Sequence, residues 1–348
     1  MPELNVIRTA SRAPFVCVSL TVVAVLFGDG ATLNAQAWVP AKGEGTVTVT
    51  YQNVYNKGHF DRQGRETPNG ATHSKSVLTD LTYGVTDTTA LTVSLPFVAA
   101  KYTGPRPSYF VGGIETFPGP LDDGVYHGAF QDLRLEVRHA FVAGPLTVTP
   151  LVAVALPTHA YETVGEAVPG RHRRELQLGA NAGVLLDRIA RGAYVHARYT
   201  YTTARRLQDL PYRLSNIDLE GGHALTSRVA LRGLASWQMA HEAPTIAQLA
   251  PSWRVHDRFV VPNYLHLGAG ASVALTHSTE IHALWVSAVS GRGGAHIART
   301  FAVGTSWSFG GGLSGLTASA PSAERTGGTM GVRSASFPSN GPVVEYGR

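Results

Sequence analysis

The sequence has very little cysteine, little charge and few long apolar runs, and each shortage excludes a class of protein. Its one cysteine, Cys17, lies in the leader described below, so the rest of the chain has neither a disulfide nor a thiolate metal site. Charged residues make up 15% of the 348 residues and the mean hydropathy is −0.00. These values exclude both a disordered chain and a bundle of membrane helices.

Motifs of the common enzyme classes are also missing. The sequence contains no HExxH, no GxSxG, no phosphate-binding loop and no dinucleotide-binding glycine pattern. Its 14 histidines are scattered, and no group of them has ligand spacing on one strand. The net charge of +5 is dispersed, whereas a nucleic-acid-binding face needs clustered basic residues. We therefore expect no enzymatic activity, no catalytic residue, no cofactor, no metal site and no nucleic-acid partner.

Residues 1–37 have the three parts of an export signal. Arg8 and Arg12 form a basic start, residues 13–27 form an apolar core, and Ala35-Gln36-Ala37 matches a cleavage site. The apolar core is shorter than the about 20 residues of a membrane-spanning helix, which favours a cleaved leader over an anchor. The mature chain is predicted to begin near Trp38.

Alternation of polar and apolar residues is the main feature of residues 38–310. Within residues 129–141, four charged side chains share one face of the predicted strand, namely Asp132, Arg134, Glu136 and Arg138, while the opposite face is apolar. Four charges cannot face an apolar core unpaired. A membrane barrel satisfies both faces, because lipid covers the outside and polar groups meet inside.

The same alternation predicts an all-β fold, an antiparallel transmembrane β-barrel of the outer-membrane type with about 12 strands. The expected strands are 44–56, 74–84, 90–102, 129–141, 145–157, 173–186, 192–204, 214–225, 228–240, 263–275, 279–290 and 295–309.

The connections between these strands alternate between long and short, as in barrels with long outer loops and short periplasmic turns. This pattern predicts the cell outer membrane as the location, with outer-membrane lipids and the barrel-assembly machinery as partners. The oligomeric state is left open. Residues 311–348 are rich in Gly, Ser, Ala and Thr without periodicity, which indicates a flexible tail.

Several short motifs resemble one family of barrels. Residues 81–87 (LTYGVTD), 93–97 (VSLPF), 132–135 (DLRL) and 154–158 (VALPT) are similar to the outer-membrane transporter family of the phenol meta-degradation pathway. The likeness covers roughly residues 44–310. It implies a non-enzymatic barrel that passes aromatic or other hydrophobic compounds, without identifying the compound.

Charged side chains on the predicted inner face are the candidate permeation residues. They are Asp132, Arg134, Glu136, Arg138, Arg198, Asp218, Glu220, Arg228 and Arg232. Two interpretations stay open, a polar conduit that screens permeants and an ion-pair network that fills the barrel. A second candidate site is an apolar patch at the outer mouth, carried by residues 103–128 and formed by Tyr102, Tyr109, Phe110 and Phe117.

Passive transport of small hydrophobic or aromatic compounds is the function that these patterns favour. The first alternative is a structural or adhesive barrel with a sealed lumen. The second is a hydrolase at the membrane rim that uses His139 or His223, since both fall on the predicted lipid-facing side.

Overall fold

Twelve antiparallel strands close into a barrel, with β17 paired to β1. The structure is a computed structural model, and it describes residues 37–68, 70–105, 109–111, 114–116, 119–143, 145–204, 206, 212–242 and 262–310. The twelve-strand fold predicted from the sequence is thereby confirmed. The predicted leader, apart from Ala37, and the predicted tail 311–348 lie outside the described residues. No helix in the described part of the chain is long and apolar enough to cross a membrane.

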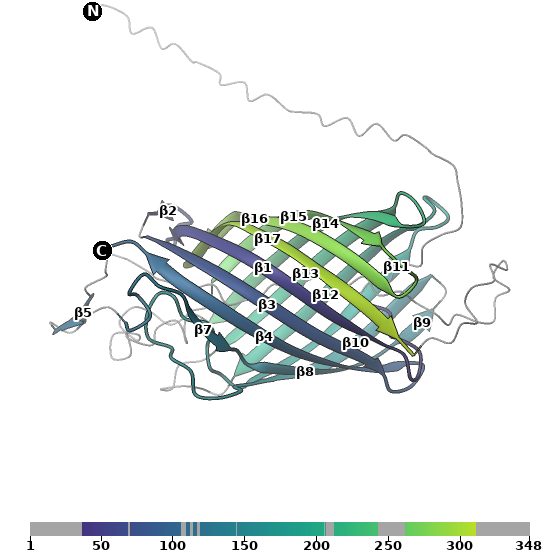
Figure 1. Cartoon of the computed structure of the whole chain (residues 1–348), viewed down its shortest axis with the longest axis horizontal. Coiled ribbons are helices and arrows are strands. Elements are labelled where there is room, and N and C mark those ends of the chain that lie inside the picture. The colour runs from purple at the N-terminus through teal and green to yellow at the C-terminus, as the bar shows by residue number, and fades with distance from the viewer. Residues whose placement is uncertain are drawn as a thin grey trace, which may run out of the picture.

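The barrel strands are inclined and lie side by side around the molecule (Figure 1). They are β1 (Gly45–Phe60), β3 (Ala71–Gly84), β4 (Thr89–Thr103), β7 (His127–Phe130), β8 (Leu133–His139), β9 (Phe141–Ala143), β10 (Leu146–Leu156), β11 (Glu175–Leu185), β12 (Ala193–Ala204), β13 (Arg213–Ala224), β14 (Val229–Glu242), β15 (Asn263–Ala274), β16 (Thr279–Arg292) and β17 (Gly294–Phe309).

The fourth barrel strand is interrupted, which the sequence did not indicate. It consists of β7, β8 and β9 in succession; β7 and β8 pair with β4, and β8 and β9 pair with β10. At the first interruption, Gln131 donates from its amide to the carbonyl of Pro96. Three short strands complete the structure: β2 (Glu66–Thr67) pairs with β1, while β5 (Tyr109–Val111) and β6 (Ile114–Thr116) pair with each other.

Both faces of the wall follow the predicted alternation. On β1, the side chains of Thr46, Thr48, Thr50 and Gln52 are buried inside, whereas Val49 and Tyr51 are exposed outside. Large apolar side chains are exposed on the outer face of strand after strand, including Leu91, Val152, Leu178, Leu231, Trp285 and Phe301. Such a continuous apolar surface is far larger than a water-soluble monomer leaves uncovered.

Short turns at one end share a local chemistry. Thr86, Thr226 and Thr276 begin three of the hairpin turns, and each accepts a hydrogen bond through its hydroxyl oxygen from the amide three residues later, at 2.9 to 3.0 Å. We call this the short-turn end. The opposite, long-loop end carries the long connections, except between β16 and β17, where Gly293 alone turns the chain with φ at 61°.

Candidate functional site: the barrel lumen

One carboxylate inside the barrel binds three arginines. Glu136 lies on β8 and is 2% exposed. Its Oε2 accepts from Arg134 at 2.5 Å and from Arg198 of β12 at 2.6 Å, and its Oε1 accepts from Arg138 at 3.4 Å. Because β10 and β11 separate β8 from β12 in the sheet, the pair with Arg198 reaches across the inner surface and braces the wall.

Beside this cluster lies a cavity of about 170 Å³. Charged groups line much of it, among them Asp80, Asp132, Arg134, Glu175, Arg198 and Asp218. An apolar part of the lining is formed by Leu78, Pro96, Leu214 and Tyr264. The lumen therefore contains both an ion-pair network and open space, so the two interpretations drawn from the sequence describe different parts of one interior.

Most of the predicted permeation residues lie inside. Asp218 accepts from the hydroxyl of Ser236 at 2.6 Å, the buried Glu220 accepts from the hydroxyl of Tyr194, and Arg232 is buried. Arg228 is an exception and the prediction of its position is wrong: it is exposed in the turn before β14, where its amide donates to Thr226. Alternation continued one residue too far, because the hairpin turn begins before that position.

Asp132 anchors a loop at the long-loop end. Its Oδ1 accepts from the hydroxyl of Tyr161 at 2.8 Å and its Oδ2 from the amide of Arg173 at 3.3 Å. The same Tyr161 oxygen accepts from the amide of His172 at 2.7 Å. Asp132 thus holds residues 157–174 in the mouth of the barrel as well as lining the cavity.

Two arginines of that loop enclose an aromatic ring, a feature that the sequence analysis missed. Arg171 donates to the hydroxyl of Tyr212, and the guanidinium of Arg173 lies 4.4 Å from the Tyr212 ring centroid. All three side chains are buried. Both arginines belong to a connection without alternation, so no periodic pattern placed them in the lumen.

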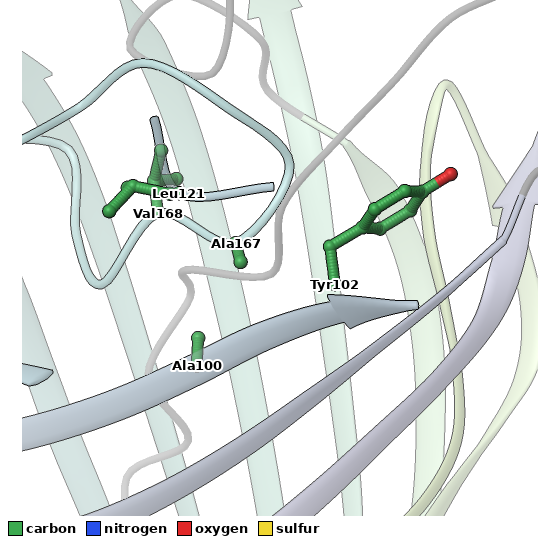
Figure 2. Close-up of a cluster of buried hydrophobic side chains, with 5 residues drawn as sticks. All are labelled: Ala100, Tyr102, Leu121, Ala167 and Val168. Carbon is green, nitrogen blue, oxygen red and sulfur yellow. The ribbon is translucent and has the colours of Figure 1, made fainter. Parts of the chain in front are cut away.

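Two outer loops pack on each other through a small apolar cluster on the inner side of β4 (Figure 2). The cluster consists of Ala100, Tyr102, Leu121, Ala167 and Val168. A hydrogen bond of 2.7 Å from the amide of Glu166 to Asp122 joins the same loops.

This packing corrects the predicted apolar patch at the outer mouth. Tyr102 is buried at 5% exposure, with its hydroxyl donating to the carbonyl of Pro105, so it is not a surface residue. Tyr109 and Phe110 lie on β5, whose backbone alone is described, and Phe117 lies outside the described residues.

At the short-turn end, residues 37–44 form a strap across part of the lumen. The amide of Gly43 donates to the carbonyl of Gly84 on β3, and Lys42 donates to Asp87 at 3.0 Å. At its other end, the carbonyl of Ala37 accepts from the hydroxyl of Thr149 on β10 at 2.5 Å.

A glycine on β11 makes room for this strap. A Cβ placed on Gly183 would lie 2.5 Å from the Cβ of Ala37 and 2.8 Å from the ring of Trp38. The strap therefore spans from β3 to β10 and β11, and it narrows the mouth on the short-turn side.

The histidines proposed for a rim hydrolase do not meet a serine. His139 contacts Thr89 at 2.9 Å and the ring of Phe141, and His223 lies opposite Ala193 and Leu231. A serine–histidine contact of 2.7 Å does occur between Ser215 and His241. Ser215 is 1% exposed and also bonds the Tyr199 hydroxyl, so its oxygen is closed to an ester. No group of three potential metal ligands occurs among the described residues.

Comparison with known proteins supports the fold. No family model and no curated protein sequence matches the chain. The crystal structure of an outer membrane channel from Pseudomonas putida F1 matches with a TM-score of 0.61 and 12% identity, covering 79% of this chain and 98% of that chain. Lower TM-scores are found for the monoaromatic hydrocarbon channel TodX (0.39, 9% identity, 79% and 92% covered) and the translocator domain of autotransporter NalP from Neisseria meningitidis (0.43, 13%, 77% and 89%).

The first of these matches confirms a barrel with the fold of an outer-membrane channel. At 12% identity it says nothing about the permeant. The link to phenol degradation, drawn from short motifs in the sequence, stays a prediction.

Proposed function

We propose that this protein is a passive channel of the outer membrane, exported by means of residues 1–37. The observation that carries the proposal is the combination of an apolar outer wall with a charged inner wall around a cavity of about 170 Å³. Apolar side chains exposed on every side favour lipid, while buried ion pairs favour an interior that accepts polar groups. The barrel-assembly machinery and outer-membrane lipids are the partners that this location implies.

The lining favours a small molecule with both an apolar part and a polar group. Leu78, Pro96 and Leu214 provide the apolar side, and Arg134 and Asp132 face the same space. A hydroxyl or carboxylate bonds to these charged groups, while an aromatic ring contacts the apolar side chains. This class includes the aromatic compounds that the sequence motifs imply, provided that they carry a polar substituent.

Single-channel recording tests the proposal. Protein purified from outer membranes, with folding verified by a heat-shifted gel band, is inserted into a planar bilayer. We expect small discrete conductance steps. Benzoate and benzyl alcohol should cause transient blocks, and formate and methanol, which lack the ring, should not. Folded and inserted protein that stays silent at every voltage would contradict the channel.

A sealed structural barrel is the second candidate, and it rests on a specific observation. The strap narrows the short-turn end, and the loops joined by Asp122 and Glu166 lie in the other mouth. Silence in the wild type together with conductance after removal of either obstruction would favour this alternative.

A further inference from the structure

A row of cationic and aromatic side chains lies on the outside of the barrel near the long-loop end. Antiparallel pairing places Arg299 opposite Tyr55, Tyr55 opposite His73, and His73 opposite Lys101. Their strands, β17, β1, β3 and β4, are the four that face the viewer in Figure 1. Three inter-strand steps of about 4.8 Å make the row about 14 Å long. We call these four residues, together with Lys75, the outer basic row.

Aromatic rings hold the cations of this row in place. The guanidinium of Arg299 lies 5.3 Å from the Tyr55 ring centroid, and the rings of Tyr55 and His73 are 4.7 Å apart. The ammonium groups of Lys75 and Lys101 lie 4.7 and 5.0 Å from the same ring, that of Tyr126. Two lysines sharing one ring are thus close to each other, and their like charges repel.

Carboxylates do not relieve this repulsion. Among the described residues, Lys75, Lys101 and Arg299 form no ion pair with an acidic side chain. Neighbouring carboxylates are engaged elsewhere, since Glu66 binds Lys57 at 3.0 Å and Asp123 binds His127 at 2.8 Å. The surface is therefore arranged to accept an anion from outside the chain.

The height of the row on the barrel identifies the kind of anion. Two ladder positions nearer the short-turn end, the outward residues of the same four strands are Val303, Tyr51, Val77 and Phe97, all exposed. The row thus lies where the apolar belt gives way to charge, which is the level of lipid headgroups. Near the long-loop ends of β11, β12 and β14 the outward residues are instead Leu176, Tyr201 and Trp237, so the cations gather on one side only.

We propose that the outer basic row binds the phosphate groups of a lipid in the outer leaflet. Lysine and arginine stems lie along the apolar belt while their charged ends reach the headgroup. Several cations spread over about 14 Å suit a headgroup with more than one phosphate. This inference rests on the membrane location proposed above.

Native mass spectrometry of the folded protein in detergent tests the proposal, with diphosphoryl lipid A as the probe. The test variant carries Lys75→Gln, Lys101→Gln and Arg299→Gln. The matched control carries Arg188→Gln, Arg191→Gln and Arg228→Gln, which removes three exposed charges at the short-turn end. We expect the test variant to retain lipid A about tenfold less well or worse, because each cation near a charged lipid surface contributes to binding. The control should bind as the wild type does.

Further arms separate the outcomes. Lysine-to-arginine exchange at positions 75 and 101 should preserve binding and shows that charge is needed. Equal retention of dephosphorylated lipid A, or of lipid A by the test variant, would overturn the proposal. Displacement of lipid A by millimolar inorganic phosphate would assign the row to a soluble anion instead. Protein that never inserts into vesicles would contradict the membrane location, whereas inserted protein without lipid A preference contradicts this inference alone.

Discussion

Single buried charges set the properties of the lumen. Glu136 satisfies three arginines at once, and its surroundings are closed to bulk water. Removing one partner of a buried ion pair leaves the others uncompensated and costs far more than an exposed pair contributes.

Glu136→Gln should therefore destabilise the barrel by about 3–5 kcal/mol, as measured by denaturant unfolding in liposomes. Because three guanidinium groups remain, the channel should also shift toward anion selectivity, measured as a change in reversal potential across a salt gradient. Arg228→Gln, in the exposed turn, is the control. An unchanged reversal potential in the Glu136 variant would contradict this account of the lumen.

Asp61 at the long-loop end makes a local pH dependence. The backbone amide of Arg65 donates to its carboxylate at 2.8 Å and lowers the pKa of Asp61, an effect reinforced by the Arg65 side chain and the Gln63 amide. Since the folded pKa lies below the unfolded value of about 3.9, the stabilisation is complete above that pH and is lost as pH falls through the folded pKa.

Hydrogen exchange at Gln63 and Arg65 measures this effect. We expect protection to be constant above about pH 4 and to disappear on further acidification. Asp61→Asn should abolish the difference at every pH. Protection that persists in the Asn variant would show that the carboxylate does not hold the turn.

Elements at the two ends of the barrel determine how wide the path is. The strap of residues 37–44 lies at the short-turn end, and the loop pair joined by Asp122 lies at the other. Neither belongs to the wall, so each can be altered without changing the strand pairing.

Trp38→Ala should raise the single-channel conductance, because the indole ring that packs on Gly183 inside the lumen is removed. The control is Trp307→Ala, which removes an indole from the outer face of β17. Equal conductance in wild type and Trp38→Ala protein would mean that the strap does not lie in the path.

Asp122→Ala should loosen the loop pair, because the amide of Glu166 loses its acceptor. We expect more frequent openings at unchanged barrel stability, recorded as a higher open probability with the same heat-shifted band. A variant with altered stability and unchanged gating would place Asp122 in the fold and not in a cover.

Closure of the whole molecule depends on the seam between the first and last strands. Gly304 on β17 pairs with Thr50 of β1, and a Cβ there would lie 2.7 Å from the carbonyl oxygen of Val49 and 2.5 Å from His282. A barrel has no edge to relax, so a displacement at the seam is transmitted around it.

Gly304→Val should therefore reduce the heat-shifted, folded fraction on a gel. Gly233→Val is the matched control, since a Cβ at that position meets nothing within 4 Å. Equal folding of both variants would show that the seam tolerates the extra volume.

Strand number, the two faces of the wall and the position of most lumen charges followed from alternation in the sequence, because the direction of a side chain on a strand is a local property. The bulk of the predicted boundaries hold, and Arg228 failed where a turn ends the alternation. Contacts between distant parts of the chain depended on the tertiary structure. Arg198 reaches Glu136 across 62 residues, and Thr149 reaches Ala37 across 112. Register between strands and the path of irregular loops place these partners together, and neither leaves a periodic pattern in the sequence.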